Sequence, residues 1–212
     1  MKIKRFEFNM FPVNCYVISD ESREAVIIDA GCYYEEEQQA LKKYILDNNL
    51  TVTHLINTHL HLDHIFGNAF VEREFGVKPE ASQFDEFLLP HTADHCRMFG
   101  IPLNEEPVPL GGYIADGDII RFGNSELRAI LLPGHSPGGL AFYCEQSGIL
   151  FSGDVLFQGS IGRADLEGGD FATLRNSILK RLFVLPDNTI VYPGHGNSTT
   201  IGNEKMDNPF FR

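Results

Sequence analysis

Four potential metal ligands occur within six consecutive positions of the chain: His59, His61, Asp63 and His64. They directly follow the largely apolar run Val52–Ile56, which predicts a buried strand that ends at the cluster. Burying such polar side chains without partners would cost about 1–3 kcal/mol each. A divalent ion would satisfy several of them together, so the spacing points to metal-dependent chemistry.

Three further candidates, His135, Asp154 and His195, each stand next to a glycine just after an apolar run. The glycine lets the backbone approach closely, and a strand end can aim the side chain into a cleft. Any one of these residues alone is most simply a loop residue. The same pattern of apolar run, glycine and potential ligand occurs three times, however, which favours one metal site to which all three residues contribute.

Seven nitrogen and oxygen ligands suit two borderline divalent ions that share one carboxylate. Zinc is our first expectation, and iron and manganese accept the same ligands. The four cysteines show no CxxC spacing, so we expect buried or idle thiols rather than disulfides or a thiolate zinc site. These cysteines are Cys15, Cys32, Cys96 and Cys144.

The elements that must position these residues follow from the hydrophobic pattern. Expected strands span residues 2–8, 14–18, 24–29, 52–57, 118–122, 125–132, 139–144, 148–152 and 189–192. Expected helices span residues 35–48, 65–75, 82–99 and 171–183, and residues 100–112 read as a loop. The order suggests two similar halves packed as helix, sheet, sheet and helix. No linker divides them, so residues 1–212 are expected to form one α/β domain.

The expected helix 82–99 carries His91 and His95 one turn apart. This spacing can clamp a metal ion, but no acidic partner stands nearby in the sequence. We therefore expect a solvated or substrate-facing helix surface at this place.

The composition and charge of the chain disfavour some functions. The net charge of −12 would repel nucleic acid phosphates, which disfavours nucleic acid as a partner. The N-terminal residues Met1–Arg5 do not begin a signal peptide, and no apolar run is long enough to span a membrane. A cytoplasmic protein without a membrane partner is the expectation.

The order and spacing of the seven candidate ligands resemble the metallo-β-lactamase fold superfamily, and the resemblance extends from Asn14 to His195. Within it, Ser152–Phe157 and Gly162–Asp165 resemble the glyoxalase II-like hydrolases, especially their short, single-domain bacterial and archaeal members. The resemblance implies a four-layer αββα sandwich. It also implies His59, His61 and His135 on one metal ion, Asp63, His64 and His195 on the other, and Asp154 between them.

The implied reaction is hydrolysis of a small acyl thioester by metal-bound hydroxide, with S-lactoylglutathione as one candidate substrate. Asp63 and Asp154 are the expected catalytic carboxylates. Arg163 is the candidate contact for an anionic group of the substrate, and an ion pair with Asp165 is the plainer alternative. The helical C-terminal domain that binds glutathione in full-length glyoxalase II has no counterpart after His195, so glutathione specificity is not implied.

Supporting roles are expected for Asp29, Thr58 and Ser136, which stand beside the ligand segments. Asp29 could orient the ligand loop through a hydrogen bond to a ligand. A simple turn at the entry to the following helix explains Asp29 equally well.

Two other functions compete with hydrolysis. The Gly162-Arg163-x-Asp165 motif also resembles persulfide dioxygenases of the same fold, which would hold one iron with His59, His135 and Asp154. A non-catalytic protein could keep the metals for stability or for partner binding. The complete ligand set argues for an enzyme.

Overall fold

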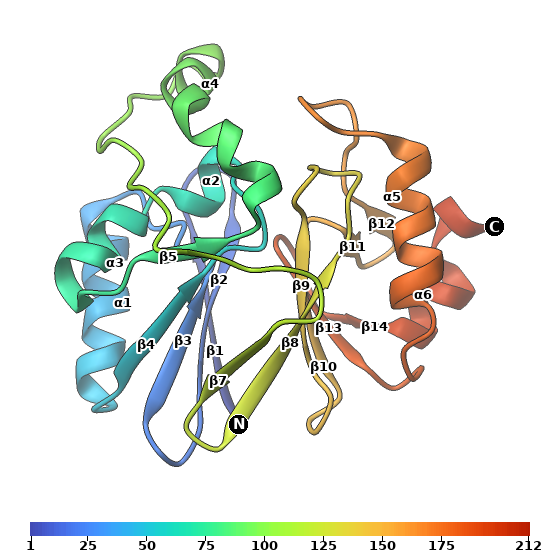
Figure 1. Ribbon diagram of the computed structural model, residues 1–212, viewed down its shortest axis with the longest axis horizontal. Helices are drawn as coiled ribbons and strands as arrows, with labels where there is room; N and C mark the ends of the chain where they lie inside the picture. The colour runs from blue at the N-terminus through green and yellow to red at the C-terminus, as the bar shows by residue number, and fades with distance from the viewer.

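Two six-stranded sheets lie face to face, and helices cover the outer face of each sheet (Figure 1). The computed structural model describes all residues from 1 to 212. The layers run helix, sheet, sheet, helix, which confirms the expected αββα sandwich. The chain completes the first sheet before it begins the second, so each half contributes its own strands and helices.

The first sheet has the strand order β1-β2-β3-β4-β5-β6. Its first three strands are antiparallel, and β3 to β6 run parallel to one another. The strands are β1 (Lys2–Phe8), β2 (Val13–Ser19), β3 (Glu24–Ile28), β4 (Thr51–Ile56), β5 (Pro79–Ala81) and β6 (Gly112–Tyr113). This half also contains the helices α1 (Glu35–Asp47), α2 (Leu62–Ile65), α3 (Asn68–Phe75) and α4 (Thr92–Phe99).

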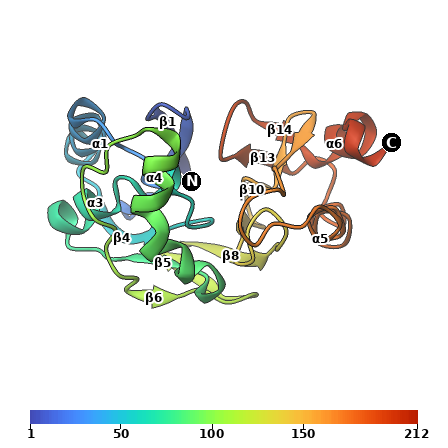
Figure 2. The ribbon, with the colours of Figure 1, turned by 90° about the horizontal axis from the view of Figure 1, so that it is seen from above.

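The second sheet has the order β14-β13-β10-β9-β8-β7, in which only the β10–β13 pair is parallel. Its strands are β7 (Ile119–Phe122), β8 (Ser125–Leu131), β9 (Leu140–Cys144), β10 (Ile149–Gly153), β13 (Ile190–Pro193) and β14 (Thr199–Thr200). A separate ribbon joins β11 (Leu156–Phe157) to β12 (Ser160–Ile161). The helices α5 (Phe171–Ser177) and α6 (Ile201–Asp207) pack outside this sheet (Figure 2).

Alternating side chains of the central strands fill separate cores on the two faces of a sheet. Along β2, Tyr16 and Ile18 enter the core between the sheets, whereas Val17 packs in the core shared with α1 and α3. Along β9, Phe142 faces the other sheet and Ala141 faces α5. Burial on both faces explains why these strands read as continuous apolar runs.

Two expected helices are interrupted near the candidate site, so their predicted extents were wrong. The helix predicted over 65–75 is divided into α2 and α3 at Gly67, whose N–H donates to the Ala30 carbonyl over 2.6 Å. A Cβ at Gly67 would collide with Cys32, so the close approach needs glycine. The helix predicted over 82–99 begins as a 3₁₀ segment, Gln83–His91, that contains Pro90, and only then becomes α4.

Smaller differences concern short elements. Helix 171–183 ends as α-helix at Ser177 and widens to a π-helical turn, Ile178–Leu182. The strands β5, β6, β11, β12 and β14 have two or three residues each, too few to show a hydrophobic period. All four cysteines are free and buried, as expected for thiols outside a disulfide framework. None of the helices is both long enough and apolar enough to cross a bilayer.

Candidate metal centre

The candidate ligands leave the carboxyl ends of four strands at one end of the sandwich. The cluster His59–His64 follows β4, and His135, Asp154 and His195 follow β8, β10 and β13. The parallel strands β10 and β13 are neighbours, so the loops after them start side by side. The two sheets thus contribute ligands from opposite walls, and the structure brings all seven predicted residues together.

Three ring nitrogens form the first group of ligand atoms. His135 Nε2 lies 3.2 Å from His59 Nε2 and 2.9 Å from His61 Nδ1. His59 and His135 are buried, and His61 is partly exposed. Around a tetrahedral zinc ion with Zn–N bonds of about 2.0–2.1 Å, ligand atoms lie roughly 3.3 Å apart. Both distances from His135 are close to the separation that a shared ion requires, and all three atoms lie within 4.8 Å of one another.

A second group joins Asp63, His64 and His195. Asp63 Oδ2 lies 3.6 Å from His64 Nε2 and 3.3 Å from His195 Nε2. Asp154 lies between the groups: its Oδ1 is 3.5 Å from His64 Nε2, and its Oδ2 is 3.4 Å from His195 Nε2 and 3.8 Å from His135 Nε2. This carboxylate reaches both groups, as a bridging ligand must.

The buried polar atoms of the cluster show that the residues fit metal ions. His64 Nε2 and Asp154 Oδ1 are buried and have no hydrogen-bond partner within the protein. Such orphaned atoms are rare in folded proteins because each costs about 1–3 kcal/mol. Both atoms face the other ligands, so divalent ions at these two positions would satisfy them.

Contacts with the protein fix which ring nitrogen four of the five histidines present to the site. His59 Nδ1 lies 3.0 Å from Thr58 Oγ1, and His64 Nδ1 lies 3.0 Å from Asp29 Oδ2. His135 Nδ1 donates to the Arg163 carbonyl over 2.7 Å, and His195 Nδ1 to the Pro12 carbonyl over 3.2 Å. In each of these four rings Nε2 is left for the site, an arrangement common among metal-binding histidines.

Asp29 and Thr58 support the cluster as expected. Asp29 is buried, and it accepts hydrogen bonds from the backbone N–H and the hydroxyl of Thr58, both over 2.7 Å. Ser136 acts elsewhere: its hydroxyl donates to Asp85 over 2.7 Å, and Gly138 N–H donates to the same carboxylate over 2.5 Å. Asp85 thus ties the loop of His135 to the 3₁₀ segment.

Sequence reasoning did not identify Asp85, nor the carbonyls of Pro12 and Arg163. Asp85 stands fifty positions before His135 in a segment without a motif, and backbone carbonyls leave no residue signal. Their roles depend on contacts between loops that are far apart in the sequence.

The charge states of the cluster suit cation binding. Burial and the neighbouring His135 ring lower the pKa of His61 to about 3, so this ring is neutral at pH 7. Burial acts to raise the pKa of Asp154, but the rings of His64 and His195 hold it well below its usual range. Burial also acts to lower the pKa of His195, but Asp154 and Asp63 raise it to about 10. A bound cation would take the place of the proton on His195.

Glycine is required beside the bridging carboxylate. A Cβ at Gly194 would meet the side chain of Asp154 and would lie 2.9 Å from His64 Cε1. Gly153, just before Asp154, has φ +50°, a conformation that other residues adopt only with strain. The glycines that flank the expected ligands therefore let two loops approach each other closely.

A cleft of about 520 Å³ opens above the cluster. Its floor includes His61, Asp63, Asp154 and His195, and Arg163 lies on its rim. Its apolar wall consists of Phe11, Leu62, Leu88, Met98, Phe99 and Leu166. The cleft therefore combines a floor of potential metal ligands with an apolar wall, and small-molecule sites often pair polar groups with apolar surface in this way.

Arg163 pairs with Asp165, which was the plainer alternative to an anion contact. Its Nε and one terminal nitrogen donate to the two carboxylate oxygens over 2.8 and 2.9 Å. Both side chains are more than half exposed. The guanidinium keeps a further edge available, so the ion pair and an anion contact are compatible.

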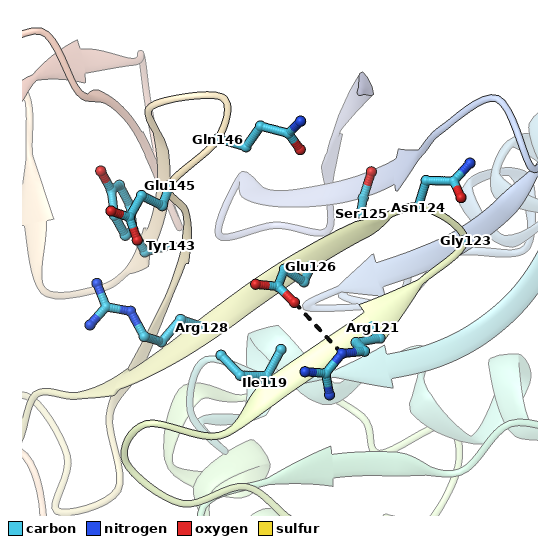
Figure 3. Close-up of a pocket in the computed structure, with 10 residues that line it drawn as sticks. All are labelled: Ile119, Arg121, Gly123, Asn124, Ser125, Glu126, Arg128, Tyr143, Glu145 and Gln146. Carbon is cyan, nitrogen blue, oxygen red and sulfur yellow. Dashed lines mark ion pairs between the residues drawn. The ribbon is translucent and has the colours of Figure 1, made fainter.

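A second cavity, of about 550 Å³, lies over the strands β7, β8 and β9, away from the cluster (Figure 3). It contains no histidine, and its Arg121 pairs with Glu126 over 3.6 Å. This hollow offers paired surface charges and lacks the convergent ligands of the first cleft.

The expectation that His91 and His95 lack an acidic partner was wrong. Glu167, in the loop before α5, has its Oε2 3.4 Å from His91 Nδ1 and 3.8 Å from His95 Nε2. The long separation in sequence concealed this partner.

Comparisons with known proteins agree with this geometry. The model of the Metallo-beta-lactamase superfamily matches residues 9–195. Hydroxyacylglutathione hydrolase GloC of Haemophilus influenzae is 38% identical over 99% of this chain and 98% of its own. The crystal structure of BLEG-1 B3 metallo-beta-lactamase has a TM-score of 0.89 at 35% identity and covers 99% of both chains. TTHA1623, solved in a di-iron-bound form, has a TM-score of 0.86 at 34% identity over 98% of this chain and 99% of its own.

Proposed function

The chain belongs to the metallo-beta-lactamase superfamily, and we propose that it hydrolyses small acyl thioesters with a pair of divalent metal ions. The proposal rests mainly on the position of Asp154: its carboxylate lies between two groups of three ligands each. The proposal takes residues 1–212 as one catalytic domain, because ligands come from both halves.

Zinc is the first candidate metal, and iron is supported by the di-iron form of TTHA1623. Two bound divalent ions would supply Lewis acidity, which would lower the pKa of a bound water and polarise the acyl carbonyl. His59, His61 and His135 would hold one ion, and Asp63, His64 and His195 the other, with Asp154 between them.

The protein's own groups would orient the reactants. Asp63 is the carboxylate of the second group that also lines the cleft, so it can orient the attacking water and accept its proton. The water oxygen bonds to the acyl carbon, the carbon–sulfur bond breaks, and the leaving sulfur takes a proton to give a free thiol. The apolar wall beside Phe99 would exclude bulk water from this step.

S-lactoylglutathione is the first substrate to examine, because the relative GloC is a hydroxyacylglutathione hydrolase by name. Arg163 at the rim would contact an anionic group of the thiol portion. The net charge of −12 argues against nucleic acid as the substrate.

Release of free thiol by the metal-loaded protein tests the proposal against a panel of acyl thioesters. We expect turnover of at least one thioester, and a loss of about 10²–10⁴-fold in Asp63→Asn. Asp94→Asn makes the same charge change on the exposed face of α4 and should keep full activity. A blank panel, or oxygen uptake with glutathione persulfide in its place, would refute thioester hydrolysis.

A further inference from the structure

A second group of potential ligands stands at the mouth of the cleft, apart from the seven residues above. His91 immediately precedes α4, His95 lies one turn further along it, and Glu167 reaches them from the loop before α5. Figure 1 shows α4 and the loop before α5 at the same end of the molecule, one in each half. We propose that His91, His95 and Glu167 form a third divalent-metal site that joins the two walls of the cleft.

The distances support a shared ion. Glu167 Oε2 lies 3.4 Å from His91 Nδ1 and 3.8 Å from His95 Nε2, and all three ligand atoms lie within 4.8 Å of one another. The ligand atoms of the main cluster show similar spacings, from 2.9 Å for His61 and His135 to 3.8 Å for His135 and Asp154. Small side-chain rotations would bring the three atoms around one zinc ion.

The donor set has the chemistry of a metal site. Histidines four residues apart on a helix present their rings on one face, as in zinc-binding helices. Two neutral rings and one carboxylate leave a zinc ion with one net positive charge and an open fourth position. Glu167 is the only side chain that forms an ion pair with either ring.

The position of the group gives the third ion a structural consequence. His95 and Glu167 line the same cleft as Arg163, and Glu167 belongs to the same loop as Arg163. An ion between them would connect α4, which carries Met98 and Phe99 of the apolar wall, to the loop that carries Arg163. It would therefore restrain both sides of the entrance and add positive charge near the expected anion contact.

Equilibrium dialysis of the metal-loaded protein against buffered Zn²⁺, followed by elemental analysis, tests the proposal. Wild type should bind one zinc equivalent per chain more than Glu167→Gln and more than the double variant His91→Ala/His95→Ala. Asp94→Asn removes the same charge as Glu167→Gln, but from α4, where Asp94 pairs with Arg97, and it should keep the additional equivalent. The comparison is a difference between proteins, so it holds whatever number of ions the main centre binds.

Amide hydrogen exchange gives a second readout that does not depend on activity. Zinc should slow exchange in residues 92–99 and 164–169 of wild type severalfold, and it should leave Glu167→Gln unchanged. The proposal is overturned if wild type and Glu167→Gln bind equal amounts of zinc. It is also overturned if Asp94→Asn loses as much zinc as Glu167→Gln does, since net charge would then explain the effect.

Discussion

Asp29 Oδ2 lies 3.0 Å from His64 Nδ1 at the centre of the buried cluster. This contact determines that His64 turns its Nε2 towards Asp63 and Asp154. The same carboxylate accepts two hydrogen bonds from Thr58, which directly precedes the ligand His59. One aspartate at the end of β3 thus orients ligands that follow β4.

Replacement of Asp29 by asparagine should weaken metal binding by about 10–100-fold, since contacts of this kind orient the ligand and raise its basicity. The amide can no longer accept from Thr58 N–H, Thr58 Oγ1 and the His64 ring together. Competition with a chromophoric chelator measures the affinity. Asp47→Asn, at the exposed end of α1, provides the matched loss of charge and should bind metal as wild type does. Equal affinities in the two variants would contradict the role of Asp29.

Replacement of Asp85 by alanine should destabilise the loop of His135. The variant leaves the Ser136 hydroxyl and the Gly138 N–H without an acceptor in a buried site, at a cost of about 1–3 kcal/mol for each donor. Urea unfolding of the metal-free protein measures the loss of stability. Ser136→Ala removes only one of the two donors and should cost less. A stability equal to that of wild type would mean that the loop is held by other contacts.

Metal binding should release protons at pH 7. Burial acts to lower the pKa of His64, but three carboxylates led by Asp63 raise it well above its usual value, and the pKa of His195 is raised to about 10. Both rings therefore hold protons in the metal-free protein, and both must lose them to bind a cation. Calorimetry in buffers of different ionisation enthalpy should show release of about two protons per chain.

The sign of the pH dependence follows from the same shifts. Because the pKa values are raised, protons compete more strongly with the metal as pH falls, so the apparent metal affinity should increase with pH from 6 to 9. An affinity independent of pH in this range would show that these rings are already neutral or are not ligands.

Replacement of Arg163 by alanine should raise KM for an anionic thioester by about tenfold and change kcat little, because a contact made equally in the ground and transition states affects KM alone. The carbonyl of residue 163 remains to accept from His135, so the metal site should stay intact. Initial rates over a range of substrate concentrations separate the two constants. Arg121→Ala, on the distant strand β7, is the control. An unchanged KM would assign Arg163 to its pair with Asp165 alone.

The sequence could predict the layers of the fold and the gathering of the ligands, because both depend on local patterns. Buried central strands show as apolar runs, and each ligand follows such a run beside a glycine, as Asp154 follows Gly153. The division of a predicted helix at Gly67 could not be predicted, since it depends on contacts with Ala30 and Cys32 from another loop.

Contacts between residues that are distant in sequence could not be predicted either. Asp85 supports a loop fifty residues away, and Glu167 meets His91 and His95 from the opposite half of the molecule. Such contacts depend on how two loops pack against each other. The hydrophobic pattern of neither segment contains information about that packing. Asp29 was within reach of prediction because it stands at a strand end beside the ligand strand β4.

The metal content of the Glu167→Gln protein, purified without added metal and dialysed against metal-free buffer, tests the paired centre most directly. This variant removes the proposed third site and leaves the seven residues of the main cluster intact. The geometry predicts two divalent ions per chain, and loss of at least one of them in Asp154→Ala. A single iron per chain, or no bound metal, would contradict a centre in which Asp154 joins two ions.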